Sequence, residues 1–180
     1  MHDKIKNIAS ILFDQGIRNV VISPGSRNAP LTIAFVEHKG FNINMIYDER
    51  SAGFIALGQS IASKTPSVLI CTSGTACINY YPAICEAYYQ EIPLIVLTAD
   101  RPQELIDQGD GQSIRQQNVF ANHILDSYQL LPDYTSEQSY DHLQRVVNDA
   151  FHKSSNSDKK GPVHILSLIH ISEPTRQEAI

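Results

Sequence analysis

The sequence contains no tryptophan, two methionines and three cysteines, and no run of Lys or Arg is longer than two residues. Its formal net charge is −5, which argues against binding to nucleic acid or to an anionic membrane surface. No apolar run approaches the roughly 18 residues of a membrane span, and no signal peptide is visible. Because no two cysteines have CxxC spacing, we expect buried thiols in a reducing, cytoplasmic compartment.

The sequence does contain the composition of an ordinary folded domain. Its 180 residues are 42% hydrophobic and 18% charged, which predicts one domain with a substantial core. Apolar β-rich runs predict strands at 19–22, 43–47, 67–71, 94–97, 128–131 and 161–165. Helical periodicity predicts helices at 5–12, 31–37, 51–63, 75–88 and 136–153. This alternation indicates an α/β fold with a parallel sheet and helices on both faces.

Unusually polar loops follow four of these strands, at 23–29, 48–51, 72–76 and 98–117. In parallel α/β sheets, ligands bind beyond the carboxyl ends of the strands. The loops collect charged residues, namely Arg27, Glu49, Arg50, Arg101 and Arg115. Several arginines beside a carboxylate favour an anionic, carboxylate-bearing substrate, because the guanidinium group binds carboxylates in bidentate fashion. The helix start at 72–75 adds backbone N–H groups that suit an anion.

Several of these residues have a simpler alternative. Glu49 stands at the start of a helix, where a carboxylate is commonly only a cap. Arg50 and Arg115 either contact substrate or form ion pairs with Asp48 or Glu49. The histidines are scattered without ligand spacing, so we interpret them as surface or packing residues and expect no metal ligands in this chain.

Five motifs, in register along the chain, resemble one enzyme family. They are Ser23-Pro24-Gly25-Ser26-Arg27, Asp48-Glu49-Arg50-Ser51-Ala52-Gly53, Thr72-Ser73-Gly74-Thr75-Ala76, Thr98-Ala99-Asp100-Arg101-Pro102-Gln103-Glu104-Leu105 and Ile114-Arg115-Gln116. Over residues 3 to 165 the chain is similar to the N-terminal, pyrimidine-binding domain of the 2-succinyl-5-enolpyruvyl-6-hydroxy-3-cyclohexene-1-carboxylate (SEPHCHC) synthase family. These are thiamine-diphosphate transferases of menaquinone biosynthesis. Asp48-Glu49, where related decarboxylases have His-Glu, favours this family over its relatives.

The resemblance implies a reaction and a set of roles. The family decarboxylates 2-oxoglutarate and adds the succinyl unit to isochorismate. Glu49 matches the catalytic glutamate that hydrogen-bonds the aminopyrimidine ring of the cofactor and promotes its imino tautomer. Cofactor contacts are implied for Glu49, Thr72, Ser73, Gly74 and Thr75. Substrate contacts are implied for Ser26, Arg27, Arg101 and Gln112.

The resemblance also implies partners outside this sequence. Mg²⁺ and the diphosphate are held by a later domain with a Gly-Asp-Gly…Asn motif, which does not occur after Gly161. The family assembles as a homodimer or a dimer of dimers, so that a fragment alone is expected to be inactive. The helices after Glu49 and Gly74 are expected to form the dimer contact through small and aromatic residues, namely Ala52, Ala56, Tyr80, Tyr81, Tyr88 and Tyr89.

The last fifteen residues have a different character. The run Leu166-Ser167-Leu168-Ile169-His170-Ile171-Ser172-Glu173-Pro174-Thr175-Arg176 matches the in-frame translation of a transposon-end sequencing adapter. We therefore expect residues 1–165 to form the pyrimidine-binding domain and residues 166–180 to be a non-native tail. The alternative is a genuine divergent terminus.

Two other functions stay open at this point. The chain could act as a stand-alone, non-catalytic domain of the pyrimidine type that binds an anion or a partner chain. It could also belong to a different thiamine-diphosphate enzyme, of the acetohydroxyacid synthase type. Product analysis with 2-oxoglutarate against pyruvate separates the two enzymes.

Overall fold

A parallel β-sheet forms the centre of the molecule. The computed structural model describes residues 2–109, 111–131 and 136–168. Within these residues, six strands pair in the order β2-β1-β3-β4-β6-β5, all parallel. They are β1 (Asn19–Ile22), β2 (Asn42–Met45), β3 (Ser67–Cys71), β4 (Leu94–Ala99), β5 (Ser127–Leu130) and β6 (Pro162–Ser167).

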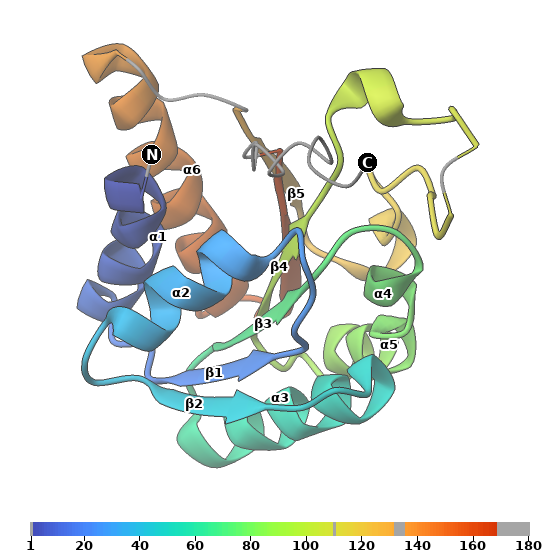
Figure 1. Cartoon of the computed structure of the whole chain (residues 1–180). Coiled ribbons are helices and arrows are strands. Elements are labelled where there is room, and N and C mark those ends of the chain that lie inside the picture. Colours follow the sequence, from blue (N-terminus) through green and yellow to red (C-terminus); the bar gives the residue numbers. More distant parts are fainter. Residues whose placement is uncertain (1, 110, 132–135, 169–180) are drawn as a thin grey trace.

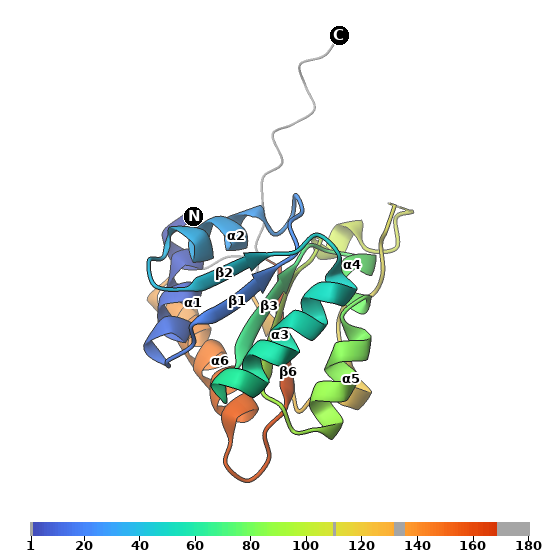
Figure 2. The same cartoon turned by 90° about the horizontal axis from the view of Figure 1, so that it is seen from below.

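Helices cover both faces of this sheet (Figures 1 and 2). One face packs against α1 (His2–Asp14), α2 (Ala29–Glu37) and α6 (Glu137–Ser155). The other packs against α3 (Glu49–Ser63), α4 (Thr75–Ile78) and α5 (Tyr81–Tyr89). Two short 3₁₀ turns, η1 (Gln103–Leu105) and η2 (Ala121–His123), follow β4. The predicted fold class, a parallel sheet between two helical layers, is confirmed.

The central strands are apolar because both of their faces are covered. All residues of β3 and β4 are buried. Successive side chains of a strand point to opposite faces, so Val68 and Ile70 join the core under α1, α2 and α6, whereas Leu69 and Cys71 join the core under α3 to α5. The result is two apolar cores separated by the sheet, which holds the carboxyl ends of the strands rigidly in one row.

Two predicted elements differ from the structure. The single helix expected at 75–88 is two helices, α4 and α5, because Pro82 in the first turn of α5 has no N–H to continue a hydrogen-bond ladder from α4. The strand expected at 43–47 ends at Met45, and the side chain of Tyr47 is 84% exposed beyond it. The bounds of β1 and β3 agree with the prediction.

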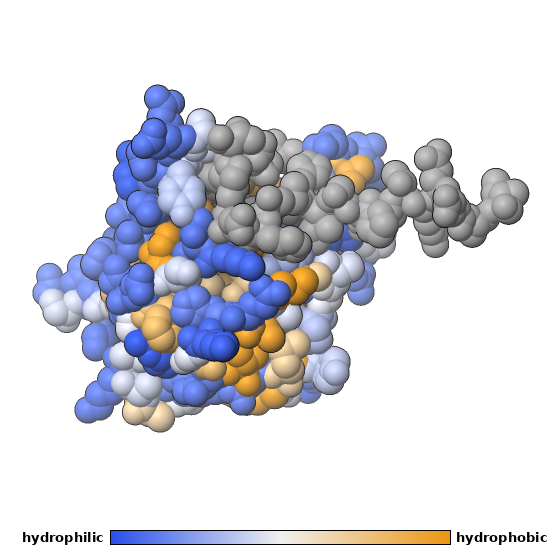
Figure 3. Space-filling model, turned by 60° about the vertical axis from the view of Figure 1, so that its left-hand side comes forward, coloured by the Kyte–Doolittle hydropathy of each residue, from blue (hydrophilic) through white to orange (hydrophobic). Residues whose placement is uncertain are grey.

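Three of the six residues expected at a dimer contact are internal, whereas Tyr81 and Tyr88 are partly exposed and Tyr89 is exposed. Ala52, Ala56 and Tyr80 are completely buried against the sheet, so the prediction that they contact a second subunit is wrong. The Tyr80 hydroxyl donates to the carbonyl of Ile70 at 2.9 Å, which holds this ring inside the core. Apolar side chains that are exposed on α3 are Phe54, Ile55 and Ile61. Figure 3 shows apolar patches among hydrophilic residues on one face of the molecule.

The end of β6 lies beyond the predicted domain boundary. β6 runs to Ser167 and pairs there with Ala99 and Leu130, two residues past the expected boundary at 165. Most of the predicted tail, residues 169–180, lies outside the described residues. The non-native origin of 166–180 stays a prediction. No helix in the described part of the chain is long and apolar enough to cross a membrane.

Candidate active site

The four polar loops lie along one edge of the sheet. Since all strands are parallel, the loops after β1, β2, β3 and β4 leave the sheet at its carboxyl edge. The helices α2, α3 and α4 begin at this same edge (Figure 1). The order along it runs from Glu49 after β2, through Arg27 after β1 and Gly74 after β3, to Arg101 after β4.

Glu49 is in the first turn of α3, but it is not the cap. The carboxylate of Asp48 accepts a hydrogen bond from the backbone N–H of Ser51 at 3.0 Å and caps the helix. Glu49 is half-buried, and its carboxylate makes no hydrogen bond or ion pair with the described residues. Arg50 is exposed, and within the described residues it forms no ion pair with Asp48 or Glu49. The Glu49 carboxylate is therefore placed at the carboxyl edge with its acceptor capacity unused.

The turn at 73–75 uses two of its N–H groups internally. Gly74 has φ of +80° and donates its N–H to the Oε1 atom of Gln116 at 2.6 Å. Thr75 donates its N–H to the carbonyl oxygen of Gln112 at 3.0 Å. The prediction that this turn offers N–H groups to an anion is therefore wrong for these two residues. The half-buried side chain of Thr72 and the buried side chain of Ser73 lie beside them.

Arg101 connects this turn to the loop after β4. Its side chain is 5% exposed, although it carries a charge. One guanidinium nitrogen donates to the Ser73 hydroxyl at 3.3 Å and the other terminal nitrogen donates to the carbonyl of Gly111 at 2.7 Å. Part of its hydrogen-bonding capacity therefore holds the loop in place, at the same edge as Glu49.

The charges of two of the predicted arginines act on the buried carboxyl of Asp100. Burial raises the pKa of the Asp100 carboxyl, while the hydrogen bond from the Arg101 N–H, at 2.7 Å, and the charges of Arg101 and Arg27 lower it. Arg27, from the loop after β1, thus acts on the same carboxylate as Arg101, from the loop after β4. The side chains of Ser26 and Gln112 are exposed at this edge. The buried Asp100 carboxyl thus lies within electrostatic reach of Arg101 and Arg27, two of the residues predicted to bind substrate.

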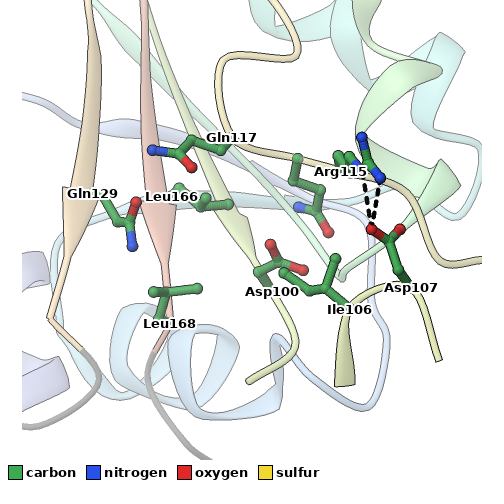
Figure 4. Close-up of a pocket in the computed structure, with 9 residues that line it drawn as sticks. Asp100, Ile106, Asp107, Arg115, Gln117, Gln129, Leu166 and Leu168 are labelled. Carbon is green, nitrogen blue, oxygen red and sulfur yellow. Dashed lines mark hydrogen bonds and ion pairs between the residues drawn. The ribbon is translucent and has the colours of Figure 1, made fainter. Parts of the chain in front are cut away.

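A pocket of about 420 Å³ lies beyond the ends of β4 and β6 (Figure 4). Its labelled walls include Asp100, Gln129, Leu166 and Leu168. Among the residues for which the sequence offers a cofactor or substrate contact, Arg115 alone lines it, and that only as one of two alternatives. We therefore do not assign the active site to this pocket.

Arg115 lies at the rim of this pocket and pairs with a residue other than the expected ones. It forms a salt bridge with Asp107 at 2.8 Å, and the two side chains are 80% and 58% exposed. The prediction of a pair between Arg115 and Asp48 or Glu49 is wrong, because Asp107 in the same loop is closer. No group of three or more potential metal ligands occurs among residues 2–109, 111–131 and 136–168.

Gln116 was given no role by the sequence reasoning. It is completely buried and reaches the Gly74 turn with its side chain. The one available signal was its position in the motif Ile114-Arg115-Gln116, because a polar residue inside a matched motif is a candidate for a structural or functional role. Its bonding partner, 42 positions away, could not be read from local periodicity.

Comparison with known proteins decides the family. The profile described as "Thiamine pyrophosphate enzyme, N-terminal TPP binding domain" matches residues 5–126. The chain belongs to this family. The fold and the placement of Glu49 in the first turn of α3 agree with membership of this family of thiamine pyrophosphate enzyme domains.

Several curated relatives of this thiamine pyrophosphate enzyme domain are named as SEPHCHC synthases. The chain is 53% identical over 161 residues to the SEPHCHC synthase of Cytophaga hutchinsonii, covering 89% of this chain and 29% of that protein. It is 50% identical over 173 residues to the SEPHCHC synthase of Christiangramia forsetii, covering 89% and 30%. The match to the Bacteroides fragilis synthase is 42% over 180 residues, covering 98% and 32%. The chain thus spans about 30% of the length of these relatives, and the resemblance predicted from its motifs is confirmed.

Proposed function

We propose that this chain is the N-terminal, pyrimidine-binding part of a SEPHCHC synthase. The complete enzyme would be a transferase that decarboxylates 2-oxoglutarate and adds the succinyl unit to isochorismate in menaquinone biosynthesis. The similarity to relatives of that name supports this proposal. The observation that carries it is the Glu49 carboxylate, which is held at the carboxyl edge of the sheet and is not the helix cap.

Glu49 fits one end of thiamine diphosphate. When bound, this cofactor supplies the carbanion chemistry that decarboxylation of a 2-oxo acid requires. The Glu49 carboxyl has no hydrogen-bonding partner in the described residues, so it is available to share a proton with a ring nitrogen of the pyrimidine. We assign Glu49 the role of holding and moving that proton.

The diphosphate end of thiamine diphosphate fits the residues of this chain less well than the pyrimidine end does. The N–H groups of Gly74 and Thr75, which would suit a phosphate, already donate within the chain. We therefore assign the diphosphate and Mg²⁺ to a further domain of the complete enzyme, and the 72–75 turn to packing beside the pyrimidine. This division predicts a site completed by assembly into a homo-oligomer. A cytoplasmic location also stays a prediction.

The arginines define the substrate side. The charges of Arg27 and Arg101 both act on Asp100, and the Ser26 and Gln112 side chains are exposed in loops at the same edge of the sheet. Both proposed substrates carry two carboxylates, for which guanidinium groups are suitable partners. We propose that Arg27 and Arg101 bind substrate carboxylates, and that Ser26 and Gln112 hydrogen-bond substrate oxygens.

The test uses the complete reading frame, sequenced from genomic DNA without transposon adapters and expressed as a whole. Glu49→Gln keeps the size of the side chain and should lower turnover by about 100- to 10,000-fold, because the shared proton is lost. Asp48→Asn is the matched control: it also removes one charge, keeps the cap acceptor, and should leave turnover nearly unchanged.

The outcomes separate the functions. Synthesis of SEPHCHC that depends on Glu49 supports the proposal. Product from pyruvate but not from 2-oxoglutarate would indicate an enzyme of the acetohydroxyacid synthase type. Binding of 2-oxoglutarate or isochorismate without turnover would indicate a non-catalytic binding domain. Equal turnover for Glu49→Gln and wild type would overturn the role of Glu49.

A further inference from the structure

The side chain of Gln116 connects its own loop to two other segments beneath the candidate site, the turn after β3 and the end of β4. Its Oε1 atom accepts from the Gly74 N–H at 2.6 Å. Its Nε2 atom donates to the Ala99 carbonyl at 3.0 Å and lies 3.4 Å from the Thr98 hydroxyl. The amide thus spans from the turn after β3 to the end of β4, and the residue is 0% exposed.

The polar chain continues into the sheet. The Thr98 hydroxyl lies 2.8 Å from Nε2 of His164 on β6, and His164 is completely buried. Burial lowers the pKa of His164 to about 3, so the ring is neutral at ordinary pH. The Gln116 amide is therefore hydrogen-bonded to a buried, uncharged network that spans the neighbouring strands β4 and β6.

The loop that carries Gln116 is fastened to the same turn at two further points. The Gln112 carbonyl accepts from the Thr75 N–H at 3.0 Å. Arg101 bridges the Ser73 hydroxyl and the Gly111 carbonyl. Gln112 and Arg101 are the residues to which we assign substrate contacts. Of these contacts between the loop and the turn, the one made by the Gln116 amide is uncharged and fully buried. It also connects the loop to the end of β4.

We propose that Gln116 is a positioning residue, which sets the loop at 111–116 against the Gly74 turn and thereby orients Arg101 and Gln112 toward the carboxylate substrate. This proposal rests on the proposed function for its substrate, but its geometry concerns this chain alone. Gln116 touches no reacting group. It acts through the backbone and side chains that it holds.

The role requires one acceptor and one donor at a fixed separation. Glutamine supplies both, whereas an ionised carboxylate supplies acceptors only and would face the Ala99 carbonyl without a proton between them. A protonated carboxyl group has both an acceptor and a donor, so Gln116→Glu imitates the native pattern only in its acid form. Burial favours that form by raising the pKa of the introduced carboxyl. Neutral His164 is the titratable group that the network reaches through Thr98, and Asp100, Asp107 and Arg115 line the pocket that Gln116 also lines.

The test compares Gln116→Glu and Gln116→Met in the complete enzyme. At about pH 6, Gln116→Glu should retain near wild-type kcat/KM for 2-oxoglutarate, and by about pH 9 it should lose about 10- to 100-fold relative to wild type. Gln116→Met should show the loss at every pH. The loss should be larger in KM than in kcat, because the displaced residues bind substrate. A residue that only stabilised the fold would lower Tm in both variants without this dependence on pH.

A second readout does not use activity. In the 180-residue chain, the Gly74 amide should exchange slowly with solvent by NMR, and Gln116→Met should accelerate that exchange selectively over amides of α6. Unchanged Gly74 exchange, or equal kinetics at all pH values in folded variants, would overturn the proposal. An inactive wild-type enzyme with the expected exchange pattern would instead count against the proposed function alone.

Discussion

Gly74 is the glycine at which the addition of one methyl group should destabilise the fold most among the described glycines. Its φ and ψ are +80° and −142°, a conformation that residues with a side chain rarely adopt. A Cβ atom there would lie 2.1 Å from the Gln112 carbonyl oxygen, which is a backbone atom and cannot rotate away. Gly74→Ala must therefore strain the turn and push the 111–116 loop outward.

The cost can be estimated from these contacts. Backbone strain in such a region amounts to about 1–3 kcal/mol. Displacement of the Gln112 carbonyl also breaks its hydrogen bond with Thr75, worth about 1 kcal/mol. We expect Gly74→Ala to lower the free energy of unfolding by about 3 kcal/mol, or roughly 6 to 12 °C in Tm for a domain of this size.

Urea and thermal unfolding of the 180-residue chain measure this effect. Gly58→Ala is the matched control, since nothing lies within 4 Å of its added Cβ and it stands in the middle of α3. That change should raise the unfolding free energy by up to about 1 kcal/mol, because alanine is the better helix former. Equal stability of the two variants, or a Gly74→Ala variant as stable as wild type, would refute the reasoning.

Two further predictions concern buried titratable groups. Burial lowers the pKa of His164 from 6.5 to about 3 in the folded state. Because the unfolded chain therefore binds a proton that the folded chain does not, the free energy of unfolding falls as the pH drops from about 6.5 toward 3. Between pH 7 and pH 5, His164→Gln should lose about 2 kcal/mol less unfolding free energy than wild type, and equal losses would contradict this. Burial also raises the pKa of Cys71, and that of Cys77 to about 12. Iodoacetamide at about pH 8 should therefore modify half-exposed Cys85 alone in the folded protein by mass spectrometry, and rapid labelling of Cys71 or Cys77 would show the core to be open.

The sequence predicted the layers well because they depend on short-range patterns. Strand β3 is a continuous apolar run, and such a run bounded by turns indicates a strand covered on both faces. The break between α4 and α5 was missed, although Pro82 marks it, because the apolar periodicity continues across it. The cap at the start of α3 was assigned to Glu49 as one alternative, whereas the structure gives it to Asp48.

The interior of the candidate site was harder to predict. The use of the Gly74 N–H depends on a glutamine 42 residues further along, and only the folded loop after β4 brings the two together. Likewise, Ala52 and Ala56 have the small side chains of a helix contact, but sequence alone does not say whether the partner is another subunit or the sheet of the same chain. In the structure it is the sheet.

The position of β6 has a consequence for how this domain is made. β6 is the last of the described strands in the chain, yet it lies between β4 and β5 and is the only strand that pairs with β5 in the described residues. A ribosome therefore releases β5 more than thirty residues before its partner β6. The edge of β4 that pairs with β6 is unpaired over the same interval. Until β6 has emerged, the nascent chain presents an open sheet edge, which is the kind of surface that chaperones bind. The sheet should thus be completed only after β6 has been synthesised.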